Sequence, residues 1–164
     1  MIFNGYVKVQ SDTRPTFDNI TPQVKEILTE SGIKNGIIHV FSPHTTCSVQ
    51  IQEASDGQTF YGTELIMQDL INVMEKIVPT CRNEGQYLHP NHRHIELAAE
   101  LRNEKPFWSL NTDAHLRSIL MGRSVLVPVI DGEIQLGDFG YIWFGDWDQV
   151  RGRERRAIVQ VMGE

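Results

Sequence analysis

The sequence has few cysteines, no long apolar segment and no excess of positive charge, and each absence excludes a class of protein. Its 164 residues contain two cysteines, Cys47 and Cys81, too few for a disulfide framework and without the paired spacing of zinc-binding motifs. No apolar run approaches the roughly 18 residues that a membrane-spanning helix needs. Asp and Glu outnumber Lys and Arg by 21 to 15, unlike the basic balance of nucleic-acid-binding proteins. Because unpaired thiols also suit a reducing compartment, we expect a cytoplasmic protein that binds neither membranes nor nucleic acids.

The sequence also lacks linkers, internal repeats and low-complexity tracts, so we expect one domain over residues 1–164. Period-two alternation of apolar residues predicts strands, and an Asp-Gly pair between two apolar runs predicts a hairpin. The predicted strands cover residues 3–10, 36–42, 45–53, 124–130, 133–137, 141–147 and 156–162. Hairpins mixed with a few helices predict an α+β fold, with a mixed, mostly antiparallel sheet and about three to four helices.

Four segments carry helical signals. The predicted helices run from Thr21 to Gly32, over 63–77, over 94–104 and onward from Thr112. Thr21 followed by proline is typical of a helix start, with the threonine as the N-cap. In the second helix we expect a buried apolar stripe, formed by Leu65, Ile66, Leu70, Val73, Met74 and Ile77. Asp69 lies on or beside this stripe, which is an unusual place for an acid.

Histidines and carboxylates form the first candidate site. His44 precedes a strand in which Glu53 continues the apolar face, so a carboxylate is expected to close a buried surface. With Asp69, His89 and His115, these residues offer the ligands of a divalent metal such as zinc, or groups for acid–base chemistry at neutral pH. The alternative without a functional site is that each histidine is a surface or structural residue. His92 and His94 are expected to be solvated.

Arginines form the second candidate feature. The segment RGRERR at residues 151–156 supplies four of them just before the last predicted strand. Guanidinium groups bind phosphate with two parallel hydrogen bonds, and the glycine lets backbone N–H groups approach an anion. The alternative is a solvated charged turn. A histidine cluster nearby favours the phosphate-binding interpretation, because phosphate-ester chemistry needs both groups in one pocket.

A set of short motifs occurs in an order that resembles the YjbQ-like family, whose members are labelled secondary thiamine-phosphate synthases. The motifs are His44-Thr45-Thr46 with Glu53, Asp69 in the next helix, Tyr87-x-His89, Asn111-x-x-Ala114-His115-Leu116, Gly122-x-Ser124-x-x-x-Pro128, Leu136-Gly137 and Arg155-Arg156. The resemblance implies a compact α+β subunit that assembles as a trimer, with the histidines in pockets near subunit boundaries. It also implies synthesis of thiamine phosphate from a pyrimidine pyrophosphate and a thiazole phosphate, with release of pyrophosphate.

Two features depart from the family pattern. Where the family reads Leu-Gly-Thr-Trp-Gln, this chain has Leu136-Gly137-Asp138-Phe139-Gly140. Between His89 and His115 the chain also carries extra residues, roughly the predicted 94–104 helix. The loss of the tryptophan and glutamine points to a different substrate or to reduced activity. The extra residues point to a reshaped pocket mouth or an altered trimer contact.

These observations together predict an enzyme that acts on a small phosphorylated substrate, with a divalent metal, zinc or magnesium, as cofactor. The expected catalytic residues are His44, Glu53, Asp69 and His115. The expected metal ligands are His44, His89 and His115. The expected substrate-binding residues are Thr45, Asn111, Arg153, Arg155 and Arg156. The alternatives are a metal-dependent phosphate-ester hydrolase and a non-catalytic trimeric module that binds a small phosphorylated ligand or metal.

Overall fold

The strands form two antiparallel sheets in the computed structural model, which describes residues 1–164. The five-stranded sheet has the order β1 (Ile2–Gln10), β8 (Glu154–Gly163), β3 (Gly36–Phe41), β5 (Ser124–Ile130) and β6 (Glu133–Ile134). The three-stranded sheet has the order β2 (Thr16–Asn19), β7 (Tyr141–Asp146) and β4 (Cys47–Gln52). All of the strand pairs are antiparallel. The predicted α+β fold is confirmed, and the expected sheet is divided into two.

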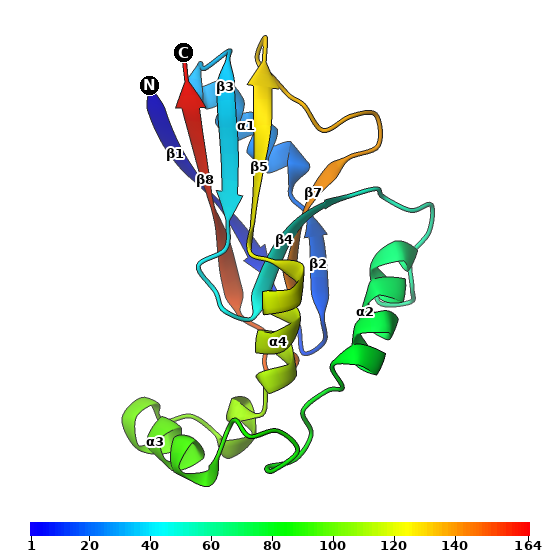
Figure 1. The fold of residues 1–164 in the computed structure, drawn as a ribbon, viewed down its shortest axis with the longest axis vertical. Coiled ribbons are helices and arrows are strands. Elements are labelled where there is room, and N and C mark those ends of the chain that lie inside the picture. The colour runs from blue at the N-terminus through cyan, green and yellow to red at the C-terminus, as the bar shows by residue number, and fades with distance from the viewer.

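Four α-helices accompany the sheets, as expected. They are α1 (Thr21–Ser31), α2 (Leu65–Ile77), α3 (His92–Arg102) and α4 (Thr112–Met121), with a short 3₁₀ helix, η1 (Pro106–Ser109), between the last two. Helix α1 contacts β1, β8 and β7, and α4 contacts β4. Figure 1 shows α2 standing beside the sheets and α3 beyond the far end of α4. The body of the protein is therefore made by the sheets, α1 and α4.

The main core lies between the two sheets and α1. Alternation along the strands places every second side chain in this core. In β1, Val7 and Val9 are buried, whereas their neighbours Tyr6 and Lys8 are exposed. The antiparallel register pairs Val7 with Ala157 of β8. The buried members from the other elements include Val24, Leu28, Ile38, Val40, Val49, Val127, Val129, Ile142, Phe144, Val159 and Val161. This burial fixes the register of the strands, because a strand that slipped by one residue would turn its buried side chains to the opposite face of the sheet.

Two local expectations were wrong. Thr21 is the first residue of α1 rather than its N-cap, and its hydroxyl instead accepts a hydrogen bond from the backbone N–H of Ile142 at 2.8 Å. The apolar stripe of α2 is largely unburied: only Met67 and Met74 are buried on this helix, and Ile77 is 62% exposed. Periodicity indicates that a helix has an apolar face, but not what covers that face.

No helix of the structure combines the length and apolar character that crossing a membrane requires. The longest, α2, has 13 residues.

Three chain segments far apart in sequence meet at one end of the three-stranded sheet (Figure 1). They are the start of β4, the first turn of α4 and the connection from β7 to β8. The backbone N–H of Trp147 donates to the carbonyl of Thr46 at 3.0 Å, which joins the first of these segments to the third. The hydroxyl of Ser118 donates to the carbonyl of Cys47 at 2.6 Å, which joins α4 to β4. Well-packed elements thus hold this end of the molecule in place.

Candidate functional site

A polar cavity of about 480 Å³ opens where these three segments meet the connection between α3 and α4. It is lined by Pro43, His44, Thr45, Thr46, His89, His94, Arg102, Glu104, Trp108, Ser109, Asn111, His115, Arg151, Arg153 and Arg155. The three histidines and two of the three arginines predicted from the sequence therefore lie in one cavity. The fold brings these groups together although the histidines are separated by 45 and 26 positions.

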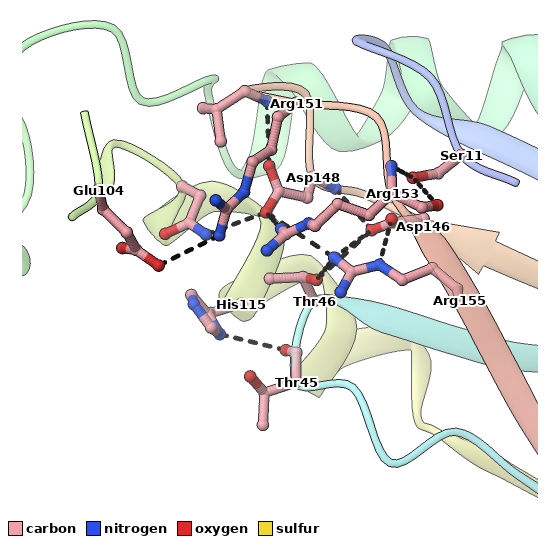
Figure 2. A network of polar contacts seen from close by, with 12 residues as sticks. Ser11, Thr45, Thr46, Glu104, His115, Asp146, Asp148, Arg151, Arg153 and Arg155 are labelled. Carbon is pink, nitrogen blue, oxygen red and sulfur yellow. Dashed lines mark hydrogen bonds and ion pairs between the residues drawn. The ribbon is translucent and has the colours of Figure 1, made fainter. Parts of the chain in front are cut away.

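Alternating arginines line one wall of the cavity. The chain runs extended from residue 151 into β8, so Arg151, Arg153 and Arg155 project to one side and Arg156 to the other. Figure 2 shows these three guanidinium groups in a row, with His115 and Thr45 opposite. Arg156 lies outside the cavity, with its guanidinium over the ring of Tyr6 at 5.5 Å. Arg156 was expected to bind substrate, but within one chain it does not line this cavity, and Arg151 takes its place in the wall.

Two fully buried carboxylates bind Arg153 and Arg155, the inner arginines of the cavity, from the side that faces away from it. Asp146 accepts from Nε of Arg155 at 2.7 Å, and Asp148 forms an ion pair with Arg153 (Figure 2). Asp148 also accepts from Nδ2 of Asn111 at 3.1 Å. Neither aspartate lines the cavity. Buried charges need a partner and further hydrogen bonds, so these contacts fix where the guanidinium groups point.

The hydrogen bonds of His115 and His44 define their tautomers. Nδ1 of His115 lies 3.2 Å from the carbonyl oxygen of Thr45, and a carbonyl only accepts, so Nδ1 carries the proton and a neutral ring has its lone pair on Nε2. Nε2 of His44 accepts from the backbone N–H of Arg156 at 3.2 Å, so a neutral ring carries its proton on Nδ1. One histidine therefore offers an acceptor and the other a donor.

All three predicted histidines favour the neutral form. Burial lowers the pKa of His44, and the nearby positive charge of Arg155 lowers it further. Burial lowers the pKa of His115 by more than its bond to the Thr45 carbonyl raises it. Burial also lowers the pKa of His89, with His94 and His115 acting in the same direction. Neutral imidazoles are the form that accepts protons near pH 7.

His94 belongs to the site, contrary to the expectation that it is solvated. Its ring centroid lies 4.5 Å from that of His89, and His89 lies 6.4 Å from His115. Helix α3 positions His94 because the side chain of Asn91 caps it, accepting from the His94 backbone N–H at 2.9 Å. His92 of the same helix is exposed and lies near Glu84 and Glu96, as expected for a solvated residue.

The two predicted catalytic carboxylates lie elsewhere in the chain. Glu53 is exposed just beyond the end of β4, and the buried strand face that it was expected to close ends before it, since Ile51 is already exposed. Asp69 is exposed on α2 beside a second, mainly apolar groove of about 390 Å³ between α2 and β4. The histidine cavity is at the opposite end of β4. Within one chain, these two carboxylates do not join the histidines.

The residues do not form a preassembled metal centre within one chain. No three His, Cys, Asp or Glu side chains come together as a set that would hold a metal ion. His44, His89 and His115 line the same cavity without converging on one point, and the nearest buried carboxylates already bind arginines. The expectation of a three-histidine metal site thus finds no matching ligand geometry.

Besides His94, seven residues of the cavity wall were not among the expected site residues: Pro43, Thr46, Arg102, Glu104, Trp108, Ser109 and Arg151.

Arg151 could have been found from the period-two spacing of RGRERR, which places residues 151, 153 and 155 on one side of an extended chain. Arg102 ends α3, Glu104 follows it and Trp108 lies in η1. Nothing in the local sequence of these three residues marks them as part of a site.

The comparisons with known proteins agree with this fold. A model of the family described as UPF0047 protein YjbQ-like matches residues 5–164. The chain is 32% identical over 144 residues to a UPF0047 protein of Archaeoglobus fulgidus, covering 88% of this chain and 89% of that protein. It is 29% identical over 158 residues to a UPF0047 protein of Methanothermobacter thermautotrophicus, covering 96% and 92%.

Two crystal structures show the same architecture. A hypothetical protein from Aeropyrum pernix K1 superimposes with a TM-score of 0.74 at 25% identity over 98% of both chains. An uncharacterized conserved protein of the yjbq/upf0047 family from Clostridium acetobutylicum superimposes with a TM-score of 0.69 at 26% identity, over 95% of this chain and 99% of that one. None of these descriptions names a reaction.

We expect Asp146→Asn to destabilise the protein by about 3–5 kcal/mol, because it removes the charge that compensates the buried guanidinium of Arg155. Urea denaturation at pH 7.5 measures the loss. The matched control is Asp138→Asn, at an exposed position between β6 and β7, which should change the free energy of unfolding by less than about 0.5 kcal/mol. Equal effects of the two substitutions would contradict the structural role of this ion pair.

Proposed function

This chain belongs to the YjbQ-like UPF0047 family, and from that premise we propose that its cavity binds a small phosphorylated molecule and acts on it as an enzyme. One observation carries the proposal: Arg153 and Arg155 enter the same polar cavity as the neutral histidines His44 and His115. Cations suit the phosphate group, and neutral imidazoles suit the proton transfers of its chemistry.

The inner arginines, Arg153 and Arg155, retain donors for a ligand. Nε and Nη2 of Arg155 bind Asp146 and Thr46, and Nη2 of Arg153 binds Asp148. Because the two aspartates bind from the side away from the cavity, the Nη1 group of each arginine is left to donate to a phosphate oxygen. The carboxylates therefore orient these cations without filling the phosphate position.

The two histidine tautomers suit different roles. Nε2 of His115, which carries the lone pair, would accept the proton of an attacking hydroxyl or water as its oxygen bonds to the reacting atom of the substrate. Nδ1–H of His44 would donate a hydrogen bond that stabilises the negative charge on the departing oxygen, and that oxygen would take its proton from the protonated His115 or from water. The inner arginines would stabilise the negative charge that accumulates on the phosphate.

Two reactions fit this arrangement. Transfer of the thiamine-phosphate synthase kind, which the sequence resemblance implies, would use Arg153 and Arg155 to hold the departing pyrophosphate while the thiazole nitrogen bonds to the carbon that carried it. That nitrogen has no proton, so this reaction would not use His115 as a base. Hydrolysis of a phosphate ester would use the same groups, with water at His115. A magnesium ion that arrives with a pyrophosphate substrate would add positive charge at the leaving group, while the roles of the residues above stay as described.

We also propose that the chain assembles as a homotrimer. Apolar side chains that stay exposed in the single chain support self-association: Val73 and Ile77 of α2, and Leu126 and Ile130 on the outer face of β5. Burying such surface between copies is favourable at roughly 25 cal/mol per Å².

Light scattering coupled to size exclusion is expected to give a mass three times the 18.8 kDa of one chain. A charged side chain in a subunit contact loses its hydration, so Val73→Asp or Leu126→Asp should shift the population toward the monomer. A stable monomer of the unsubstituted protein at micromolar concentration would refute the assembly.

We expect Arg153→Gln to weaken the binding of inorganic phosphate by roughly tenfold to a hundredfold, the loss of one or two charge-assisted hydrogen bonds. Titration calorimetry at pH 7.5 measures the dissociation constant. Arg156→Gln is the matched control, since it removes the same charge from the same short segment but outside the cavity, and it should change the affinity less than threefold. If the two substitutions weaken phosphate binding equally, only the net charge of the protein matters and the site is wrong.

Turnover is expected in a panel of thiamine precursors with magnesium and of phosphate monoesters. His115→Gln should lower the rate of phosphate-monoester hydrolysis by about 10²–10⁴-fold while phosphate affinity changes only a few-fold, because a general base is lost and the arginines remain. His92→Gln, on the exposed face of α3, should leave the rate unchanged. The rate of the unsubstituted protein should fall only below about pH 6.5, as His115 becomes protonated through its lowered pKa. Phosphate binding without turnover of any compound would instead support the non-catalytic module.

A further inference from the structure

A second pair of arginines, Arg102 and Arg151, lies at the outer end of the cavity. The carboxylate that pairs with them, Glu104, itself lines the cavity. Nε of Arg102 lies 3.3 Å from Oε1 of Glu104, and Arg151 lies 3.2 Å from the same oxygen. The guanidinium of Arg151 is also held over the ring of Trp108, 4.3 Å from its centroid. One carboxylate oxygen therefore bridges two cations, and Figure 2 shows Glu104 reaching Arg151.

The inner and outer arginines differ in where their anion sits. Asp148, behind Arg153, is fully buried and does not line the cavity, so that arginine faces an open position. Glu104 does line the cavity, and its side chain is 16% exposed. The carboxylate of Glu104 thus takes the position between Arg102 and Arg151 that an anionic group of a ligand would otherwise take.

Glu104 is held there as an anion. Burial raises the pKa of its carboxyl group, but the hydrogen bonds and charges of Arg102 and Arg151 outweigh this effect and keep the pKa below its ordinary value. A second negative group brought to the outer end would have to displace the carboxylate or lie beside it. Unpaired like charges in a partly dry cavity strongly oppose binding.

We propose that Glu104 is a specificity residue that limits the cavity to ligands with one phosphorylated end and an uncharged or cationic opposite end. The inference rests on the proposed function, because it takes the inner arginines as the phosphate position. It adds a substrate class: monophosphorylated molecules are accepted, and molecules with a second anionic group at a distance are rejected. Of the two proposed reactions, this class favours hydrolysis of a phosphate ester, because the thiamine-phosphate synthase reaction brings a second phosphorylated substrate. Glu104 lies at the end of the 94–104 region, where the sequence leads us to expect residues that the family pattern lacks.

The test compares alkyl monophosphates with α,ω-alkanediol bisphosphates of two to six carbons, by titration calorimetry at constant pH and ionic strength. The unsubstituted protein should bind the monophosphates at least as tightly as the bisphosphates of the same length. Glu104→Gln should strengthen the best-fitting bisphosphate roughly tenfold or more, because Arg102 and Arg151 are released to bind it, and should change the monophosphate affinity less than about threefold.

Glu100→Gln is the matched control. It removes the same charge from α3 at an exposed position that contacts Arg93 alone, at 4.0 Å, and should leave the preference unchanged. Glu104→Ala serves as a second variant, and thermal melting checks that both stay folded. Equal gains for mono- and bisphosphates, or a bisphosphate preference in the unsubstituted protein, would overturn the role of Glu104 alone. Failure of the unsubstituted protein to bind any monophosphate would refute the proposed function, and this inference with it.

Discussion

The candidate site depends on two carboxylates that are completely removed from solvent. Asp146 and Asp148 end β7 and begin the connection to β8, and the desolvation of each is offset by an arginine and by backbone N–H donors from residues 148 and 150. Thr46 of the segment before β4 and Asn111 at the start of α4 bind the same network. These contacts join three distant parts of the chain, so the cavity wall and the fold are stabilised by the same interactions.

This arrangement makes the cavity asymmetric in charge. At its inner end the anions lie behind the arginines, which face the cavity as preorganised donors. At its outer end Glu104 lies in front of Arg102 and Arg151 and offsets part of their positive charge. Under the proposed function, a ligand with one anionic end would therefore have one preferred direction of entry. This orientation would place the reacting atoms of a substrate near His44 and His115, and correct placement accounts for much of enzymatic rate enhancement.

The opposite end of β4 presents a different surface. Glu53 and Asp69 are exposed there, near an apolar groove formed with α2, whose apolar side chains are only partly covered. In the single chain the apolar side chains of this surface stay exposed to solvent, whereas the histidine cavity is polar and its charges are paired. The two ends of the three-stranded sheet thus have different physical characters, and self-association would cover the apolar one.

The sequence by itself determined the elements and the chemical character of the site. Alternation predicted seven of the eight strands, the Asp131–Gly132 pair predicted a hairpin, and helical signals predicted the four helices, because these patterns are local properties of the chain. Only β2, which has four residues, gave no signal. The ordered motifs also indicated the family. Together with the RGRERR segment, they singled out His44, His89, His115, Arg153 and Arg155, which share the cavity.

Only the tertiary structure decided which charged residues enter that cavity. Arg151 and Arg156 have the same side chain in the same short segment, and the path of the extended chain places one inside and the other outside. Glu53 and Asp69 follow His44 closely in sequence, yet the length of β4 carries them to the far end of the sheet. Convergence depends on how strands and helices pack over long sequence separations, and a local pattern contains no information about that path.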